Sequence, residues 1–168
     1  KTERVTALQV LSYEGMVLDS AAHADVTGPE VTQKLVAAAQ EHGLDKFFDL
    51  AAVSELRERA LFAAKVDPRQ TPLPDDVLLR ALTSAAEGKR SFAELRQERL
   101  FDYVLAQLPE GLHGKLSSLA PEHVSLPQGR RLRVHYERDK PPWVESRLQD
   151  FFGMKVGPMC GDQAIVLH

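Results

Sequence analysis

The stretch LAPEHVSLPQGRRLRVHY, residues 119–136, decides the fold, because the spacing of apolar residues changes within it. Before Pro121, apolar residues recur every three or four positions, which is typical of amphipathic helices. After it, basic and apolar side chains alternate over Arg131, Leu132, Arg133, Val134, His135 and Tyr136. Since side chains two positions apart in a strand share a face, this alternation predicts a half-buried strand with one apolar and one basic face.

Upstream of this change, residues 28–120 predict a central bundle of about five short helices. The capping-box spacings from Thr27 to Glu30 and from Ser91 to Glu94 mark two helix starts, and Gly43 marks one helix end. The expected helices cover about 28–43, 50–64, 75–88, 100–108 and 112–120, with a short turn opening at Ser91.

Both ends of the chain predict small β elements. Residues 4–20 form two apolar runs around Gly15, which predicts a hairpin. After the strand at 131–136, an amphipathic helix is expected from Trp143 to Phe152 with Gly153 as its stop, followed by a strand at 164–167. The predicted fold class is therefore α+β, with an N-terminal β-hairpin, the helical bundle and a C-terminal β-β-α-β module.

The composition excludes several protein classes. The 168 residues are 43% hydrophobic and 27% charged, which excludes a disordered tail, and the single cysteine, Cys160, excludes an internal disulfide. No apolar run approaches the ~20 residues of a membrane span, so no membrane partner is expected. The chain starts without methionine and ends in an apolar run, so we expect an excised piece of a longer protein.

Catalytic motifs are missing from the sequence. It contains no G-x-x-x-x-G-K-[ST] phosphate loop, no H-E-x-x-H, no G-x-S-x-G and no G-x-G-x-x-G. Histidines occur singly, without metal-ligand spacing, and Cys160 has no obvious base beside it, so we expect it to be a small packed hydrophobic residue. The prediction is no catalytic residue and no metal site in this chain.

Basic residues concentrate in the last third of the chain, although the net charge is −3. Arginine's planar fork suits phosphate oxygens, so a nucleic-acid-binding face is one hypothesis. Its candidate residues are Arg130, Arg131, Arg133, His135 and Arg147. The alternative is a solvated sheet face with weak surface ion pairs, because acidic residues such as Glu137 and Asp139 dilute the charge.

A series of short motifs gives the chain a family resemblance. In order, these are Leu119-Ala120-Pro121, Leu126-Pro127-x-Gly129, Tyr136, Pro141-Pro142, Arg147-Leu148-Gln149-x-x-Phe152-Gly153 and Pro158. The chain resembles the C-terminal region of the HrpB-type ATP-dependent helicases, bacterial members of the DEAH-box group. The resemblance extends over essentially the whole chain and is specific over about residues 119–158.

The resemblance implies an accessory region of a cytoplasmic helicase, without enzymatic activity of its own. ATP and magnesium would bind two upstream RecA-like domains, which would be partners together with nucleic acid, RNA rather than DNA. Residues 1–20 would be the trailing hairpin of an upstream oligonucleotide-binding-like β module, 21–122 a helical block and 123–168 a truncated C-terminal α/β module. Two alternatives remain open: a protein-interaction module acting through the helical block, and a free-standing small enzyme.

Overall fold

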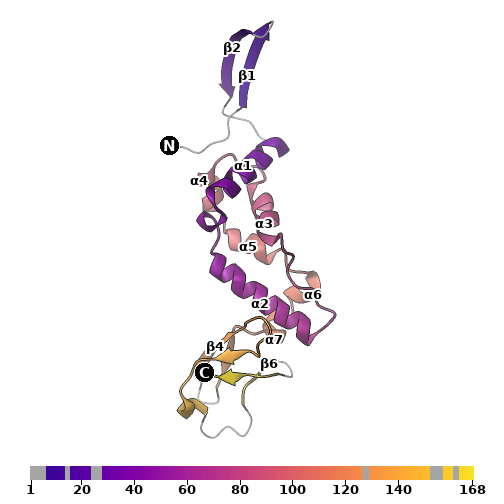
Figure 1. Cartoon of the computed structure of the whole chain (residues 1–168), viewed down its shortest axis with the longest axis vertical. Helices are drawn as coiled ribbons and strands as arrows, with labels where there is room; N and C mark the ends of the chain where they lie inside the picture. Colours follow the sequence, from indigo (N-terminus) through magenta and orange to yellow (C-terminus); the bar gives the residue numbers. More distant parts are fainter. Residues whose placement is uncertain (1–6, 14–15, 24–27, 127–128, 152–156, 161–162) are drawn as a thin grey trace. The chain divides into compact units, whose positions relative to one another are not determined.

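The computed structural model describes the chain except residues 1–6, 14–15, 24–27, 127–128, 152–156 and 161–162 (Figure 1). It confirms the α+β class. The elements are β1 (Ala7–Tyr13), β2 (Met16–His23), α1 (Pro29–His42), η1 (Leu44–Lys46), α2 (Leu50–Val66), α3 (Val77–Ala86), α4 (Phe92–Gln97), α5 (Leu100–Leu105), α6 (Glu110–His113), α7 (Leu116–Leu119), β3 (His123–Ser125), β4 (Arg131–His135), β5 (Trp143–Val144), η2 (Leu148–Phe151), β6 (Met159–Cys160), β7 (Gln163–Ala164) and β8 (Val166–Leu167).

The chain packs into two compact units. The first consists of Lys1–Leu50 and Asp75–Gln107, and the second of Ala51–Pro74 and Leu108–His168. Each unit combines segments that are distant in sequence. The domain boundaries expected after residues 20 and 122 are divisions of the sequence, and they stay a prediction.

The first unit begins with the strands β1 and β2, which pair antiparallel from Tyr13 and Met16 outward. The pairing register shifts between Leu11 and Ser12, and β2 continues to His23, into the segment expected to be a connector. Gly15, the expected turn glycine, lies outside the described residues.

Helices α1, α3, α4 and α5 form the core of the first unit. Helix α1 begins after Gly28, whose φ of 133° suits glycine, rather than after Thr27, which lies outside the described residues. Helix α3 packs on both α1 and α5. The fully buried side chains include Leu35, Val77, Leu82, Leu95 and Val104.

The helical part contains seven described α-helices, rather than about five. The short turn expected at Ser91 is a helix of its own, α4, and Glu98, whose backbone is extended with a ψ of 147°, separates it from α5. The helix expected over 112–120 is divided into α6 and α7, with Gly114 ending the first. The cap at Ser91 is confirmed, since its side chain accepts a hydrogen bond from the Glu94 backbone N–H at 3.3 Å.

The second unit combines α2, α6 and α7 with a four-stranded sheet of order β3-β4-β5-β8. Strand β4 pairs antiparallel with β3 and β5, and β5 pairs parallel with β8. The predicted alternation is confirmed, because Leu132 and Val134 are buried while Arg131 and Arg133 are exposed. A separate pair, β6 and β7, is antiparallel.

The helix predicted from Trp143 to Phe152 is wrong, so the C-terminal module is not β-β-α-β. Residues 143–144 form β5, and a 3-10 helix, η2, follows at Leu148–Phe151. Val144 is completely buried, because β5 pairs with β4 on one side and with β8 on the other. Phe152 and Gly153 lie outside the described residues.

The last predicted strand, 164–167, is divided between two sheets. Residues 163–164 belong to β7 and pair with β6, whereas 166–167 belong to β8 and pair with β5. Ile165 lies between them, buried, and its backbone N–H donates to the Pro158 carbonyl at 3.0 Å.

Candidate nucleic-acid interface

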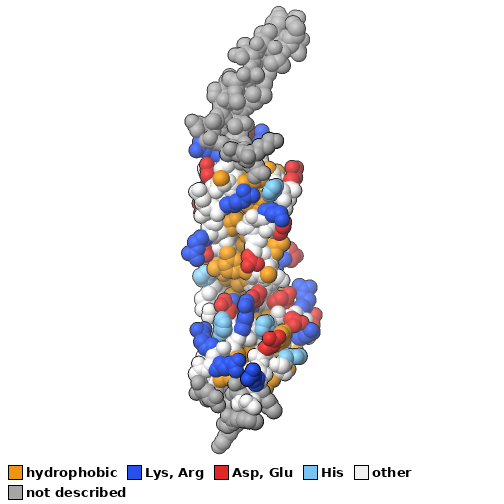
Figure 2. Space-filling view, turned by 90° about the vertical axis from the view of Figure 1, so that its left-hand side faces the viewer, with side chains coloured by type: hydrophobic (Ala, Val, Ile, Leu, Met, Phe, Trp, Pro, Cys, Tyr) orange, Lys and Arg blue, Asp and Glu red, His pale blue; other side chains and the backbone are white. Residues whose placement is uncertain are grey.

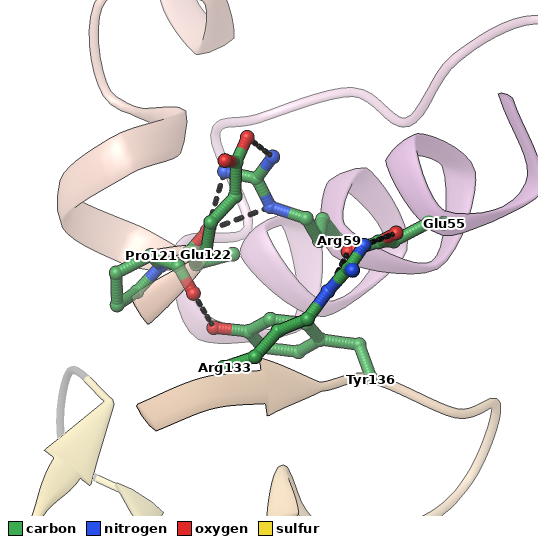
Figure 3. A network of polar contacts seen from close by, with 7 residues as sticks. Glu55, Arg59, Pro121, Glu122, Arg133 and Tyr136 are labelled. Carbon is green, nitrogen blue, oxygen red and sulfur yellow. Dashed lines mark hydrogen bonds and ion pairs between the residues drawn. The ribbon is translucent and has the colours of Figure 1, made fainter. Parts of the chain in front are cut away.

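Strand β4 presents Arg131, Arg133 and His135 on one face, as the alternation predicts. This face is not wholly solvated, because part of it is turned toward α2. The Arg133 guanidinium forms a two-pronged ion pair with Glu55 of α2, with Nε donating to Oε1 at 3.3 Å and Nη2 donating to Oε2 (Figure 3). Arg133 is therefore already neutralised within the protein.

An open groove of about 760 Å³ lies between α2 and the end of β4. It combines both signs of charge with aromatic rings. Its lining residues are Ala51, Ser54, Glu55, Glu58, Arg133, His135, Tyr136, Glu137, Arg138 and Trp143. Of the five predicted residues, the structure places Arg133 and His135 in this groove.

An aromatic pair lies in the groove. The rings of His135 and Trp143 are stacked with centroids 4.2 Å apart and an interplanar angle of 19°, because the two residues are cross-strand partners in β4 and β5. His168 meets the Trp143 ring edge-on at 5.0 Å. The sequence interpretation missed Trp143 because it placed this residue in a helix, where it would not face His135.

Glu137 fixes the orientation of the tryptophan. Its Oε1 accepts a hydrogen bond from Trp143 Nε1 at 2.9 Å, and its Oε2 accepts one from Lys140 Nζ at 2.6 Å. The Lys140 and Trp143 hydrogen bonds hold the pKa of the Glu137 carboxyl below its usual value. The carboxylate is therefore charged and occupied by protein donors.

Three charged side chains of the second unit have no partner among the described residues. Arg131 and Arg138 are exposed, and within the described part of the chain neither side chain makes a hydrogen bond or an ion pair. Glu58, half-buried on α2, also has no partner among the described residues. The other two predicted residues, Arg130 and Arg147, are exposed, lie outside the groove lining and interact within the protein.

A polar network around the buried Arg59 and Tyr136 joins elements that border the groove (Figure 3). The buried Arg59 of α2 donates through Nε and Nη2 to the Ala120 carbonyl at 3.0 and 2.9 Å, and through Nη1 to Glu122 Oε1 at 2.6 Å. The Tyr136 hydroxyl donates to the Pro121 carbonyl at 2.7 Å. These contacts join α2 and the end of β4 to the same segment, which precedes β3, and so hold the two walls of the groove in place.

Cys160 lies beside the Tyr136 hydroxyl, with Sγ and Oη 3.1 Å apart. The cysteine is 1% exposed, as expected of a packed hydrophobic residue. Burial raises the pKa of the Cys160 thiol and the pKa of the Tyr136 hydroxyl. Since the thiolate is the reactive form, Cys160 is poorly suited to act as a nucleophile.

The charge pattern of the second unit is mixed. Figure 2 shows basic, acidic and histidine side chains interspersed over the part of the surface that carries the C-terminal strands.

Among the described residues, no group of three or more His, Cys, Asp or Glu side chains could hold a metal ion. No helix in the described part of the chain has the length and hydropathy needed to cross a bilayer.

Residues 81–168 match the HrpB_C family, the C-terminal region of ATP-dependent helicases. The chain belongs to this family. The matched residues contain β4, β5 and the aromatic pair of the groove. Membership in the HrpB_C family confirms the resemblance that the motifs at 119–158 indicate.

One curated relative and two solved structures are similar to this chain. The chain is 29% identical over 135 residues to the ATP-dependent RNA helicase HrpB of Escherichia coli (strain K12), covering 77% of this chain and 17% of that relative. Its fold is similar to crystal structures titled as the E. coli DExH-box NTPase HrpB and the Escherichia coli DEAH/RHA helicase HrpB, with TM-scores of 0.70 and 0.69. Both are 24% identical and match 99% of this chain. The chain spans 23% and 24% of those two structures.

Proposed function

We propose that this chain is an accessory C-terminal region of an ATP-dependent RNA or DNA helicase and that it contributes to nucleic-acid binding, with RNA preferred. Family membership supports the helicase context, and the similarity to the E. coli RNA helicase HrpB supports RNA. The observation that carries the binding role is a pair of cations, Arg131 and Arg138, whose side chains have no partner among the described residues. Arg138 lines the groove together with the His135–Trp143 pair, and Arg131 lies four residues before His135 on the same face of β4.

Cations beside an accessible aromatic surface are the combination that binds single strands, and the His135 and Trp143 rings are half-buried. The cations attract backbone phosphates, and bases stack on the rings with little dependence on sequence. Arg133 contributes less than the sequence suggests, because Glu55 already neutralises it. The phosphate contacts are therefore assigned to Arg131 and Arg138.

The salt dependence of binding tests this assignment. Binding of a labelled single-stranded RNA to the chain should weaken with salt, and the double change Arg131→Ala/Arg138→Ala should flatten the logarithmic salt slope by about 1.4, at ~0.7 per lost contact. The matched control is Arg80→Ala/Arg99→Ala, which removes the same charge from exposed arginines paired with Asp76 and Asp102. Equal slopes in the two variants would refute a specific role for Arg131 and Arg138.

In this proposal the ATP and magnesium sites belong to RecA-like domains of the longer helicase. The lack of a phosphate-loop motif in this sequence supports the assignment of ATP binding to those domains. The region would then have no enzymatic activity alone, and its partners would be nucleic acid and those domains. A cytoplasmic location fits the single unpaired cysteine.

The alternative, a protein-interaction module, has one observation in its favour. Leu79 of α3 and Phe101 of α5 are 39% and 37% exposed on helices that pack together. Single exposed apolar residues are ordinary on protein surfaces, however, and the nucleic-acid proposal explains more of the second unit. A pull-down that loses a partner on Leu79→Ser/Phe101→Ser would favour the alternative.

A further inference from the structure

We propose that the groove between α2 and the end of β4 is a pocket for one unpaired guanine base. The base stacks on the His135–Trp143 pair, and the N–H groups of its Watson–Crick edge donate hydrogen bonds to the Glu58 carboxylate. This inference rests on the proposed function, because it assigns a base to the nucleic acid that the neighbouring cations attract.

Glu58 differs from the other two carboxylates that line the groove, because those two are bound by protein donors. Glu55 is held by the Arg133 guanidinium, and Glu137 by Lys140 and by the Trp143 indole. Glu58 is half-buried and has no partner among the described residues. Because a carboxylate that is partly removed from water needs donors, this position suits a ligand that brings N–H groups.

The aromatic pair defines the chemical class of that ligand. His135 and Trp143 stack at 4.2 Å and border the same groove as Glu58, so a flat ring system could contact both features at once. A volume of about 760 Å³ accommodates a base together with its sugar. Arg138, which also lines the groove and has no partner in the described part of the chain, can take the adjoining phosphate.

Guanine is the base whose edge fits a carboxylate. It presents two adjacent donors, the ring N1–H and the exocyclic N2 amino group, which match the two oxygens of Glu58. Adenine and cytosine place a ring-nitrogen acceptor beside their amino group, and uracil flanks its single N–H with two carbonyl oxygens, so each brings an acceptor close to a carboxylate oxygen. The base must be unpaired, since pairing occupies this edge.

Trp143 is the only tryptophan in the chain, so its fluorescence reports directly on stacking in the groove. The probes are a short oligouridine with one central guanosine, the same strand with inosine, which lacks the N2 amino group, and the plain oligouridine. We expect the guanosine strand to quench Trp143 and to bind roughly tenfold more tightly than the plain strand, with inosine between them, as for a bidentate base contact.

Two variants test the role of the carboxylate. Glu58→Gln keeps the shape of the side chain but should abolish the preference for guanosine. Glu110→Gln, an exposed glutamate outside the groove lining in the same unit, should keep that preference and serves as the matched control. Circular dichroism on each variant verifies that the fold is intact.

The outcomes separate this inference from the proposed function. Anisotropy of end-labelled strands measures binding independently of Trp143. Salt-dependent binding with equal affinity for all three strands would overturn the guanine pocket and leave the proposed function standing. A guanosine preference that survives Glu58→Gln would also overturn it, and no binding of any strand would overturn both.

Discussion

At residue 59, an arginine is buried in the second unit with a full set of acceptors. Its Nε and Nη2 donate to the Ala120 carbonyl at 3.0 and 2.9 Å, and its Nη1 donates to Glu122 Oε1. Such long-range bonds tie α2 to a segment 61 residues away in sequence, and nothing in the local pattern around residue 59 predicts them.

We therefore expect Arg59→Met to destabilise the second unit by roughly 2–3 kcal/mol, because the buried Ala120 carbonyl loses a charged donor. Urea unfolding followed by Trp143 fluorescence measures this loss. Arg69→Met is the control in the same unit, since Arg69 is 83% exposed in its pair with Asp67, and its effect should stay below about 1 kcal/mol. Equal losses in the free energy of unfolding would show that the buried Arg59 hydrogen bonds stabilise the unit no more than an exposed ion pair does.

Arg133 shows how far the sequence could predict the candidate site. The alternation predicted correctly that Arg131, Arg133 and His135 share a face. It could not predict that Glu55, 78 residues earlier, would pair with Arg133, because side-chain pairing across elements depends on tertiary packing. For the same reason it could not predict that Arg138 and Glu58 would have no partner among the described residues.

Among the elements, helix α4 shows local prediction working well. The serine–glutamate spacing predicted its start, and in the structure Ser91 caps Glu94 while the Glu94 carboxylate accepts from the Arg90 backbone N–H at 2.7 Å. The capping signal is reliable because all its partners lie within four residues.

Ser91→Ala should cost about 1 kcal/mol and lower the melting temperature by about 2–4 °C, as the loss of an N-cap does. Thermal unfolding followed by circular dichroism checks this. Ser84→Ala, at an exposed position inside α3, should leave the melting temperature unchanged or raise it slightly, because alanine is the better helix former. A loss of the same size at both positions would contradict the capping role.

Strand β5 shows where local prediction fails. The apolar spacing from Trp143 onward is compatible with a helix, but Val144 is buried by pairing with β4 and β8. A two-residue strand has almost no periodicity of its own, so its partners decide its conformation. The aromatic pair of the groove depends on this same pairing.

At the scale of the whole molecule, the helices predicted as one block are divided between two compact units. Helix α2 and the loop to Pro74 group with the C-terminal sheet, although the segment Asp75–Gln107 of the other unit lies between them in sequence. Sequence periodicity identifies individual helices, but it does not say which distant elements each helix joins. The groove exists because α2 belongs to the same unit as β4.

A helicase that contains this region would allow RNA binding to be separated from ATP hydrolysis. If the two functions lie in different parts of that protein, then Arg131→Ala/Arg138→Ala should weaken RNA binding several-fold by removing two phosphate contacts. The maximal ATPase rate at saturating RNA should stay near that of the unaltered helicase, because the ATP site is untouched. Titrating ATPase activity with RNA separates the two effects, since the RNA concentration at half-maximal rate should rise while the plateau holds. A fallen plateau with an unchanged half-maximal concentration would place these arginines in coupling to ATP hydrolysis rather than in RNA binding.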